Sequence, residues 1–505
     1  MINRKGKHLL PLAARRMGID THQELTIYLP SDSHVCHSEG FSALSRVRVE
    51  SPDKQIIATL HIVTNGLLQD QEIGFSESAW AHMELTDGDQ VWVYHPKPLE
   101  SLSHIRAKIF GHRLTRDQID DIVRDIAKGR YADVHLAAFI SSCGDGKLDV
   151  EEIIDLTRAM VEAGSKLEWD LPVIVDKHCV GGLPGNRTTP ILVPILAAAG
   201  LSMPKTSSRA ITSPAGTADT METLTNVRLD LDQIRVLVKT HGGCLAWGGS
   251  VRLSPTDDLL IRVERALEID SEGQLIASVL SKKLAAGATH VLIDIPVGST
   301  AKIRDQASAE RLSTLLRTVA ETLGLKVRIM ISDGSQPVGN GIGPALEAWD
   351  ILAVLQNKKD APQDLKIRAA EVAGELLEMC SKAEPDKGFQ MAVALIDSGA
   401  AWKKFQEICQ AQGGLQEPPV APYRYNMISP RAGVVSNIDN RQLSQTAKLA
   451  GAPADPAAGV VIYAKLGNRV KKGETLLTIH AESPGELDYA VAYLNTHRQL
   501  ITVSP

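Results

Sequence analysis

The chain has 505 residues, a formal net charge of −6 and aromatic side chains at only 4% of its positions. A chain of this length is expected to form about three domains. The scarcity of aromatic residues and the lack of a long basic tract argue against binding of a nucleic-acid polymer. A local phosphate pocket remains compatible with this composition, because it needs a few well-placed donors rather than a high overall charge.

The six cysteines are scattered, and no two of them form a Cys-x-x-Cys pair. This spacing predicts neither a disulfide framework nor a zinc site. The basic N-terminal stretch has too short an apolar run for a signal peptide, and no apolar stretch is long enough to cross a bilayer. We therefore expect a cytoplasmic protein with no metal and no membrane partner.

The N-terminal region, residues 1–98, has the pattern of a small β-barrel module. Short β-rich runs separated by turn residues occur at 24–30, 45–50, 55–63 and 90–95. Hydrophobic residues then recur at helical spacing. Thr115 and Gln118 have the spacing of a capping box, as do Asp149 and Glu152 farther along. This second pattern predicts a helical domain, formed by residues 99–170 and 252–288.

From residue 171 the chain alternates between strand-like and helix-like segments. Strand candidates lie at 171–176, 244–247, 289–297 and 326–334. The alternation predicts a large mixed α/β domain, formed by residues 171–251 and 289–415, whose ligands bind at strand ends. After a Pro-rich hinge, a β-rich α+β domain covers 416–505. The expected fold class is therefore α/β, with the helical domain facing the α/β domain across a cleft.

The stretch DKHCVGG at 176–182 combines a cation with a glycine-rich turn. Lys177 supplies a point charge, and the glycines allow backbone N–H groups to approach an oxyanion closely. Thr188 and Thr189 add neutral donors. An ordinary strand-to-helix turn with a charged rim is the alternative, and this stretch alone favours that alternative.

A second stretch, SSRAITSPAGT at 207–217, is dense in side-chain donors, namely Ser207, Ser208, Arg209, Thr212, Ser213 and Thr217. A helix cap rich in serine and threonine explains one or two hydroxyls. It does not readily explain Arg209 among them.

A third stretch covers residues 269–288. Asp270 precedes a predicted helix, on which Ser278 and Lys282 are four residues apart and share one face. The alternatives are a simple N-terminal cap for Asp270 and a solvated helix stripe for the other two. Taken alone, each alternative is at least as good as a functional role.

Together and in this order, the three stretches resemble the thymidine and pyrimidine-nucleoside phosphorylase family. The family pattern Lys-His-Ser-Thr-Gly-Gly matches residues 177–182, and its Ser-Gly-Arg segment with the following Thr-Gly-Gly-Thr matches 207–217. Its Ala-Ser-Ile-Leu-Ser-Lys-Lys run matches 277–283, and its Gln-Pro-x-Gly segment lies within 333–347. The likeness is closest to a long-chain branch that includes AMP phosphorylases and carries an extra N-terminal β module.

The resemblance implies phosphorolysis, with Asp270 as the proton donor. His178 is expected either to contact the base or to be a structural histidine in a turn. The resemblance implies that Lys177, Ser207 and Thr189 hold phosphate, which is a substrate, and that no cofactor is needed. It also implies a homodimer or larger homo-oligomer. Contacts to the nucleoside or nucleotide are implied for Gly182, Ser208, Arg209, Ala210, Ile211, Thr212, Ser213, Thr217, Ser278, Lys282 and Lys302.

The substrate stays open, because the sequence departs from the family pattern. Cys179-Val180 replaces Ser-Thr, and Val263 stands where short-chain members have an arginine that binds the pyrimidine. The reaction is either cleavage of thymidine to thymine and 2-deoxyribose 1-phosphate, or cleavage of AMP to adenine and ribose 1,5-bisphosphate. Two rivals remain: a phosphoribosyltransferase of the anthranilate type, which has a comparable SSxxGxAD segment, and a non-catalytic nucleotide sensor.

Overall fold

The computed structural model describes residues 10–505 except for eight positions: His22, Asp145, Ile211, Thr212, Arg252, Glu268, Asp270 and Arg498. The side chain of Arg265 is also outside the description. The chain forms two compact units. Unit 1 consists of Met1–Ala159 and Leu259–Ser271, and unit 2 consists of Met160–Asp258 and Glu272–Pro505.

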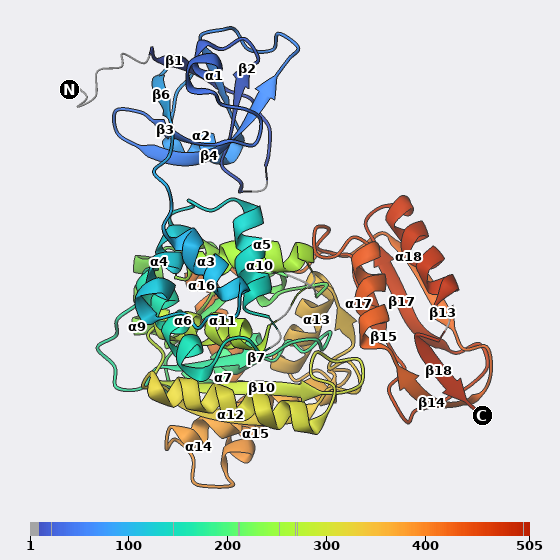
Figure 1. Cartoon of the computed structure of the whole chain (residues 1–505). Coiled ribbons are helices and arrows are strands. Elements are labelled where there is room, and N and C mark those ends of the chain that lie inside the picture. The colour runs from blue at the N-terminus through green and yellow to red at the C-terminus, as the bar shows by residue number, and fades with distance from the viewer. Residues whose placement is uncertain are drawn as a thin grey trace. The chain divides into compact units, whose positions relative to one another are not determined.

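Unit 1 begins with a closed six-stranded barrel of strand order β1-β5-β2-β4-β3-β6 (Figure 1). Closure leaves no open sheet edge, and alternating residues such as Val47 and Val49 on β3 fill the interior. The expected N-terminal barrel is therefore confirmed. Its elements are β1 Leu12–Arg16, β2 Thr26–Pro30, α1 His34–Glu39, β3 Arg46–Glu50, β4 Gln55–Val63, β5 Glu72–Phe75, α2 Glu77–Met83 and β6 Gln90–Tyr94.

The helical part of unit 1 follows the barrel. Both expected capping boxes are present: Thr115 with Gln118 opens α4, and Asp149 with Glu152 opens α6 by reciprocal hydrogen bonds of 2.9 and 3.0 Å. The helices are α3 Ser101–Ile109, α4 Arg116–Ala127, α5 Asp133–Ser142, α6 Val150–Glu162 and α10 Pro255–Leu267, of which α6 and α10 continue into unit 2.

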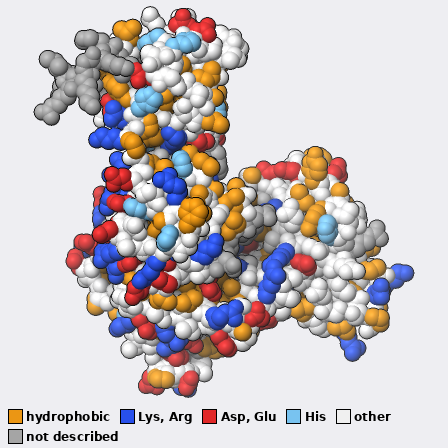
Figure 2. All heavy atoms as spheres, in the orientation of Figure 1, with side chains coloured by type: hydrophobic (Ala, Val, Ile, Leu, Met, Phe, Trp, Pro, Cys, Tyr) orange, Lys and Arg blue, Asp and Glu red, His pale blue; other side chains and the backbone are white. Residues whose placement is uncertain are grey.

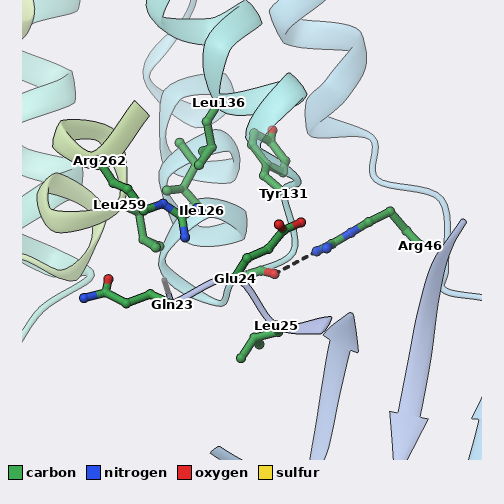
Figure 3. A pocket seen from close by; sticks show the side chains of 10 residues that line it. Gln23, Glu24, Leu25, Arg46, Ile126, Tyr131, Leu136, Leu259 and Arg262 are labelled. Atoms are coloured by element: carbon green, nitrogen blue, oxygen red, sulfur yellow. Dashed lines mark hydrogen bonds between the residues drawn. The ribbon is translucent and has the colours of Figure 1, made fainter. Parts of the chain in front are cut away.

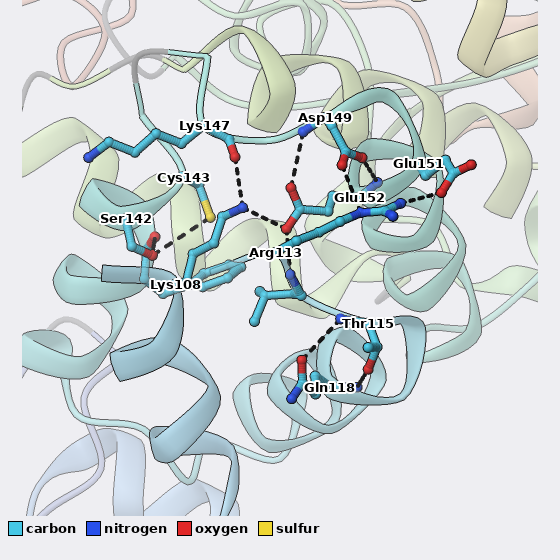
Figure 4. Close-up of polar contacts among 12 residues, drawn as sticks. Lys108, Arg113, Thr115, Gln118, Ser142, Cys143, Lys147, Asp149, Glu151 and Glu152 are labelled. Carbon is cyan, nitrogen blue, oxygen red and sulfur yellow. Dashed lines mark hydrogen bonds and ion pairs between the residues drawn. The ribbon is translucent and has the colours of Figure 1, made fainter. Parts of the chain in front are cut away.

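A buried ion pair holds α3 to α6. The ammonium of Lys108 lies 2.6 Å from a carboxylate oxygen of Glu152, and the two side chains are 4% and 2% exposed. Lys108 also donates to the carbonyl of Lys147 at 2.7 Å, and Glu152 accepts the N–H of Leu114 at 2.8 Å (Figure 4). In this cluster one cation meets one carboxylate, and neutral backbone groups complete the coordination of both.

Arg46 on β3 connects the barrel to the helical part within unit 1. Its guanidinium donates to the hydroxyl of Thr59 at 2.9 Å and to the carbonyls of Gly129 and Arg130, just after α4, at 3.1 and 3.2 Å. Figure 3 shows the Arg46 side chain among the residues that line a small cavity. This cavity, also lined by Tyr131, has a volume of about 30 Å³. Such a space holds a water molecule or two and is far too small for a nucleoside.

Unit 2 contains five parallel strands: β7 Val175–Cys179, β8 Met203–Ser207, β9 Gly243–Trp247, β10 His290–Val297 and β11 Lys326–Asp333. Strand β10 lies between β7 and β11, and β8 pairs with β9. A parallel bridge between Ile174 and Ser202 joins the two sets. The carboxyl ends of all five strands therefore lie at one edge of the sheet, which is where ligands bind in open α/β folds.

The helices of unit 2 build its core. Helix α7 is buried along almost its whole length, and α12 lies against β10 and β11 (Figure 1). The remaining elements of this part are α7 Thr189–Ala198, α8 Thr217–Glu222, α9 Leu231–His241, the 3₁₀ helix η1 Gly248–Ser250, α11 Glu272–Ala285, α12 Gln306–Thr322, β12 Gly341–Ile342, α13 Pro344–Leu355, α14 Gln363–Met379, α15 Gly388–Asp397 and α16 Ala400–Ala411.

The C-terminal part of unit 2 is β-rich, as expected. One sheet has the order β12-β15-β17-β13, so that the short strand β12 links it to the α/β part, and a second has the order β16-β14-β18. Its elements are β13 Tyr423–Ile428, β14 Gly433–Ile438, α17 Asn440–Leu449, β15 Gly459–Ile462, β16 Arg469–Val470, β17 Thr475–Ala481, α18 Pro484–Thr496 and β18 Ile501–Ser504. These features confirm the α/β fold class.

The surface carries no single dominant charge in the view of Figure 2, where basic and acidic side chains are interspersed. Within the part of the chain that the structure describes, none of the helices has the length and apolarity needed to cross a membrane.

Candidate functional site

The loops at the carboxyl edge of the unit 2 sheet pack tightly against one another. Gly182 has φ +79°, and a Cβ added there would come within 2.4 Å of the backbone nitrogen of Lys302. A Cβ at Gly216 would come within 2.5 Å of the backbone of Arg209. Only glycine permits both close approaches. The loop at Gly182 therefore packs against the loop that carries Lys302, and the loop at Gly216 folds back on Arg209.

Lys177 lies within β7, because the strand continues through Cys179 instead of ending at the predicted residue 176. Its side chain is 2% exposed, and its ammonium donates to the hydroxyl of Thr188 at 3.0 Å. The nearest carboxylate oxygen, on Asp294 of β10, is 3.7 Å away. That carboxylate also accepts the hydroxyl of Ser332 at 2.6 Å. A buried cation with one loosely held counter-charge therefore stands at the edge of the sheet.

Asp176, the residue before Lys177, carries two further buried lysines. Lys205 on β8 lies 2.9 Å from one of its carboxylate oxygens, and Lys283 on α11 lies 2.8 Å from the other. Although burial alone disfavours the carboxylate, these two ammonium groups hold the pKa of Asp176 below its ordinary value. The carboxylate is therefore charged at neutral pH and ties β7 to both β8 and α11.

His178 follows Lys177 on β7. Burial lowers its pKa well below the ordinary histidine value, and the surrounding lysines, Lys283 and Lys205 foremost, lower it further. The imidazole is thus neutral around pH 7, with one ring nitrogen able to donate and the other able to accept a hydrogen bond. A neutral ring of this kind suits the contact to a base, one of the two roles that we expected for His178.

The second predicted stretch begins where β8 ends. The buried hydroxyl oxygen of Ser207 has no hydrogen-bond partner among the described residues. Arg209, in contrast, is fully engaged: it donates to Asp219 at 3.0 Å and to Glu222 at 2.6 Å, and it stacks over the ring of Trp247 with 4.8 Å to the centroid. Ser207 is free to donate to a ligand, whereas the contacts of Arg209 shape the loop.

Thr217 begins α8 and is connected to the Lys177 loop through Arg187. The guanidinium of Arg187 donates to the Thr217 hydroxyl at 3.4 Å and to the buried carboxylate of Glu347 at 2.5 Å. Since Lys177 contacts Thr188, the consecutive residues 187 and 188 join the first two predicted stretches. The pairing of Arg187 with Glu347 was not predicted from the sequence. Their 160-residue separation leaves no local signal for the pair.

The third stretch reaches the same strand from α11. Lys283 pairs with Asp176 on β7, whereas Lys282 lies 2.5 Å from a carboxylate oxygen of Asp257 and 3.4 Å from the hydroxyl of Ser278. Ser278 and Lys282 therefore share one face, as predicted.

Other predicted site residues are placed as follows. Ala210 donates its backbone N–H to Asp219 at 2.7 Å, the Ser213 hydroxyl donates to the carbonyl of Ala215 at 2.8 Å, and Ser208 is exposed. Thr189 is the buried first residue of α7.

Three predicted residues lie outside the described part of the chain: Ile211, Thr212 and Asp270. Their expected roles stay predictions. Among the residues that are described, no group of three or more His, Cys, Asp or Glu side chains is arranged to hold a metal ion.

Comparison with known families gives three matches in chain order. Residues 102–164 match the helical bundle domain of a glycosyl transferase family, and residues 171–402 match the a/b domain of the same family. Residues 434–500 match the pyrimidine nucleoside phosphorylase C-terminal domain.

Similar proteins cover almost the whole chain. One from Maricaulis maris, named "Putative thymidine phosphorylase", is 56% identical over 493 residues, which is 97% of this chain and 95% of the relative. One of the same name from Hahella chejuensis is 54% identical over 492 residues, with 97% of each chain covered. Among solved structures, anthranilate phosphoribosyltransferase from Thermus thermophilus is 18% identical, with a TM-score of 0.49 and coverage of 61% of this chain and 98% of that one.

Proposed function

Because the chain belongs to the thymidine and pyrimidine-nucleoside phosphorylase family, we propose that it is a pentosyltransferase that cleaves the N-glycosidic bond of a nucleoside with inorganic phosphate. A phosphate oxygen forms a bond to the anomeric carbon C1′ of the sugar, from the face opposite the base. The bond from C1′ to the base nitrogen breaks, and the departing base takes a proton. The products are a free base and a pentose 1-phosphate.

The observation that carries this proposal is the set of donors at the edge of the unit 2 sheet. Buried Lys177 on β7 and the hydroxyl of Thr217 at the start of α8 are connected through Thr188 and Arg187, and the unpartnered hydroxyl of Ser207 lies at the end of β8. Donors fixed before the substrate arrives stabilise an anion without reorganisation, and they hold phosphate in position for attack. Gly182 adds a backbone that a ligand can approach closely.

Protonation of the leaving base is assigned to Asp270. A carboxylic acid can donate a proton at neutral pH only if its pKa is raised above the ordinary aspartate value. We predict that Asp270→Asn lowers kcat by about a hundredfold or more with little change in substrate binding. Steady-state kinetics with purified protein test this role, and near wild-type turnover would remove Asp270 from it.

Contacts to the nucleoside are assigned to His178, Ser278 and Lys282. The neutral imidazole of His178 and the Lys282 ammonium can donate hydrogen bonds to carbonyl oxygens of a base. The other predicted contacts, including Lys302 beside Gly182, complete the sugar and base side of the site.

Thymidine is the first proposed substrate, giving thymine and 2-deoxyribose 1-phosphate, because relatives with 54–56% identity carry that activity in their names. AMP, giving adenine and ribose 1,5-bisphosphate, is the second. One observation favours AMP: Val263, where short-chain members have the pyrimidine-binding arginine, is an apolar side chain only 6% exposed and offers no donor.

The experiment is to incubate the protein with phosphate and a panel of nucleosides and nucleoside monophosphates, and to detect free bases by chromatography. Release of thymine from thymidine supports the first substrate, and release of adenine from AMP supports the second. A protein that binds nucleotides yet releases no base from any of them would instead be a sensor.

The remaining expectations belong to the same proposal. We expect a homodimer or larger homo-oligomer that works in the cytoplasm without a metal or an organic cofactor. Activity retained in a strong chelator tests the metal expectation, and sedimentation analysis tests the assembly.

A further inference from the structure

The lysines around Asp176 outnumber the carboxylates that could neutralise them. Lys177 on β7, Lys205 on β8 and Lys283 on α11 are all buried. The buried carboxylates paired with them are Asp176 and Asp294. Three ammonium groups therefore face two carboxylates, and a buried cation without a counter-charge is strongly disfavoured. Arg368 on α14 also lies 3.9 Å from Asp294, but it has a carboxylate of its own in Glu371 at 3.8 Å.

The other titratable groups near Lys205 do not correct this imbalance. His178 on β7 is neutral, and Cys244 on the neighbouring strand β9 has its thiol pKa raised to about 12 by burial. Lys282 on α11 is matched by Asp257, and the same lysine faces Asp258 on α10, whose carboxyl pKa is raised to about 6 by burial. Within the described part of the chain, Asp176 is the carboxylate that Lys205 and Lys283 share.

Lys205 has a second contact that connects it to the proposed phosphate site. Its ammonium donates to the backbone carbonyl of Lys177 at 2.9 Å. The same Asp176 oxygen that pairs with Lys205 accepts the N–H of Lys177 at 2.6 Å. Lys205 and Asp176 thus hold both backbone groups of the residue whose side chain is proposed to bind phosphate.

This environment weakens the hold of Lys205 on its proton. Burial lowers the pKa of Lys205 below its ordinary value; Asp176 opposes this shift, and the nearby charge of Lys283 adds to it. Loss of that proton brings the cluster to charge balance when no anion is bound.

From this geometry and charge count we propose that Lys205 is a positioning residue that couples phosphate binding to the uptake of a proton. The inference rests on the proposed function, because it takes inorganic phosphate as the anion at Lys177. When the phosphate dianion binds, its negative charge stabilises the ammonium form of Lys205. The restored ammonium offsets one of the two negative charges that the dianion adds, and it keeps the carbonyl of Lys177 in place.

The sign of the pH dependence follows. An anion raises the pKa of a neighbouring lysine, so the proton is already present at low pH and must be taken up at higher pH. The pKa of Lys205 is lower in the phosphate-free protein than in the phosphate-bound protein. Between these two pKa values, the affinity for phosphate dianion falls by up to about tenfold for each unit of rising pH. Below the pKa of Lys205 in the phosphate-free protein, the lysine is already protonated, and this pH dependence of phosphate affinity vanishes.

The test is calorimetric titration of inorganic phosphate into the full chain at about pH 8.5, repeated in two buffers with different ionisation enthalpies, which gives the number of protons taken up per phosphate. For the wild type we expect uptake of about half a proton to one proton. Lys205→Met should take up none and bind phosphate about tenfold more weakly at neutral pH.

Two further variants separate this role from a merely structural one. Lys205→Arg keeps a permanent cation and should bind phosphate without proton uptake, since arginine does not deprotonate in this range. Lys239→Met changes an exposed lysine on α9 and should behave as the wild type. Folding of every variant is checked by its thermal unfolding curve.

Wild-type proton uptake that persists in Lys205→Met or in Lys205→Arg would overturn the inference, as would a wild type that binds phosphate with no uptake. These outcomes leave the proposed function intact. A wild type that neither binds phosphate nor releases a base from any substrate would instead overturn the proposed function, and the inference with it.

Discussion

Two buried lysine clusters in this molecule handle charge in opposite ways. In the helical part of unit 1, Lys108 meets one carboxylate, Glu152, and backbone groups satisfy the rest. At the sheet edge of unit 2, Lys205 and Lys283 share the single carboxylate of Asp176. The first cluster is complete within the protein, whereas the second has more lysines than carboxylates.

The difference shows that burial of charge does not by itself mark a binding site. A balanced pair with all its hydrogen bonds made has no capacity left for a ligand, and its removal affects only the fold. An unbalanced cluster beside an unpartnered donor such as Ser207 is completed by an anion.

The largest effect is expected from Glu152→Gln in the balanced cluster. The substitution leaves the Lys108 ammonium buried without a counter-charge, which costs about 3–5 kcal/mol of unfolding free energy. Urea unfolding measures the loss, and the KM for phosphate of the folded protein should not change. The control is Glu151→Gln, since Glu151 pairs with Arg113 at the surface with its side chain 74% exposed. Equal stability of the two variants would contradict the structural role of the pair.

A smaller effect, on function, is expected from Lys177→Met in the unbalanced cluster. Loss of the proposed phosphate-binding ammonium should lower kcat/KM for phosphate by about a hundredfold, as removal of a preorganised donor does in other sites. Initial rates at varied phosphate concentration measure it. Lys326→Met, at the exposed start of β11, is the matched control. An unchanged phosphate dependence would rule out Lys177 as the anion-binding group.

The smallest effect is expected from Ser207→Ala, which should weaken phosphate binding without lowering the unfolding free energy. The buried hydroxyl lacks a partner, so its removal should leave the unfolding free energy unchanged or slightly higher. The KM for phosphate should rise by about tenfold, because one neutral hydrogen bond to the ligand is lost. Ser313→Ala, which removes a hydroxyl bonded to the carbonyl of Ala309 on α12, is the control. A loss of stability without any change in KM would show that Ser207 serves the fold alone.

Local signals in the sequence predicted those features that depend on neighbouring residues. The capping boxes at Thr115 and Asp149 formed as expected, because their partners are three residues away. Strand β8 was not predicted, since its sequence MPKTS contains a proline and a lysine in place of an apolar run. The burial of Lys205 depends on a carboxylate 29 residues earlier, which no periodicity reveals.

In the candidate site, too, features set by neighbouring residues were predicted and features set by distant residues were not. Lys177, Ser207 and Thr217 were predicted from their donor-rich stretches, and they lie on β7, at the end of β8 and at the start of α8. The sequence could not identify Arg187 and Glu347 as the link between these elements, or Asp176 as the shared partner of two lysines. Those relations arise only when β7, β8, α11 and α13 pack together.

The central claim, that phosphate attacks the anomeric carbon, is tested most directly by ³¹P nuclear magnetic resonance during turnover of the best substrate in the panel. The account predicts that the signal of inorganic phosphate decreases in step with release of the base while a sugar phosphate ester signal grows. Release of the base with the inorganic phosphate signal unchanged would mean hydrolysis by water, and it would contradict the account.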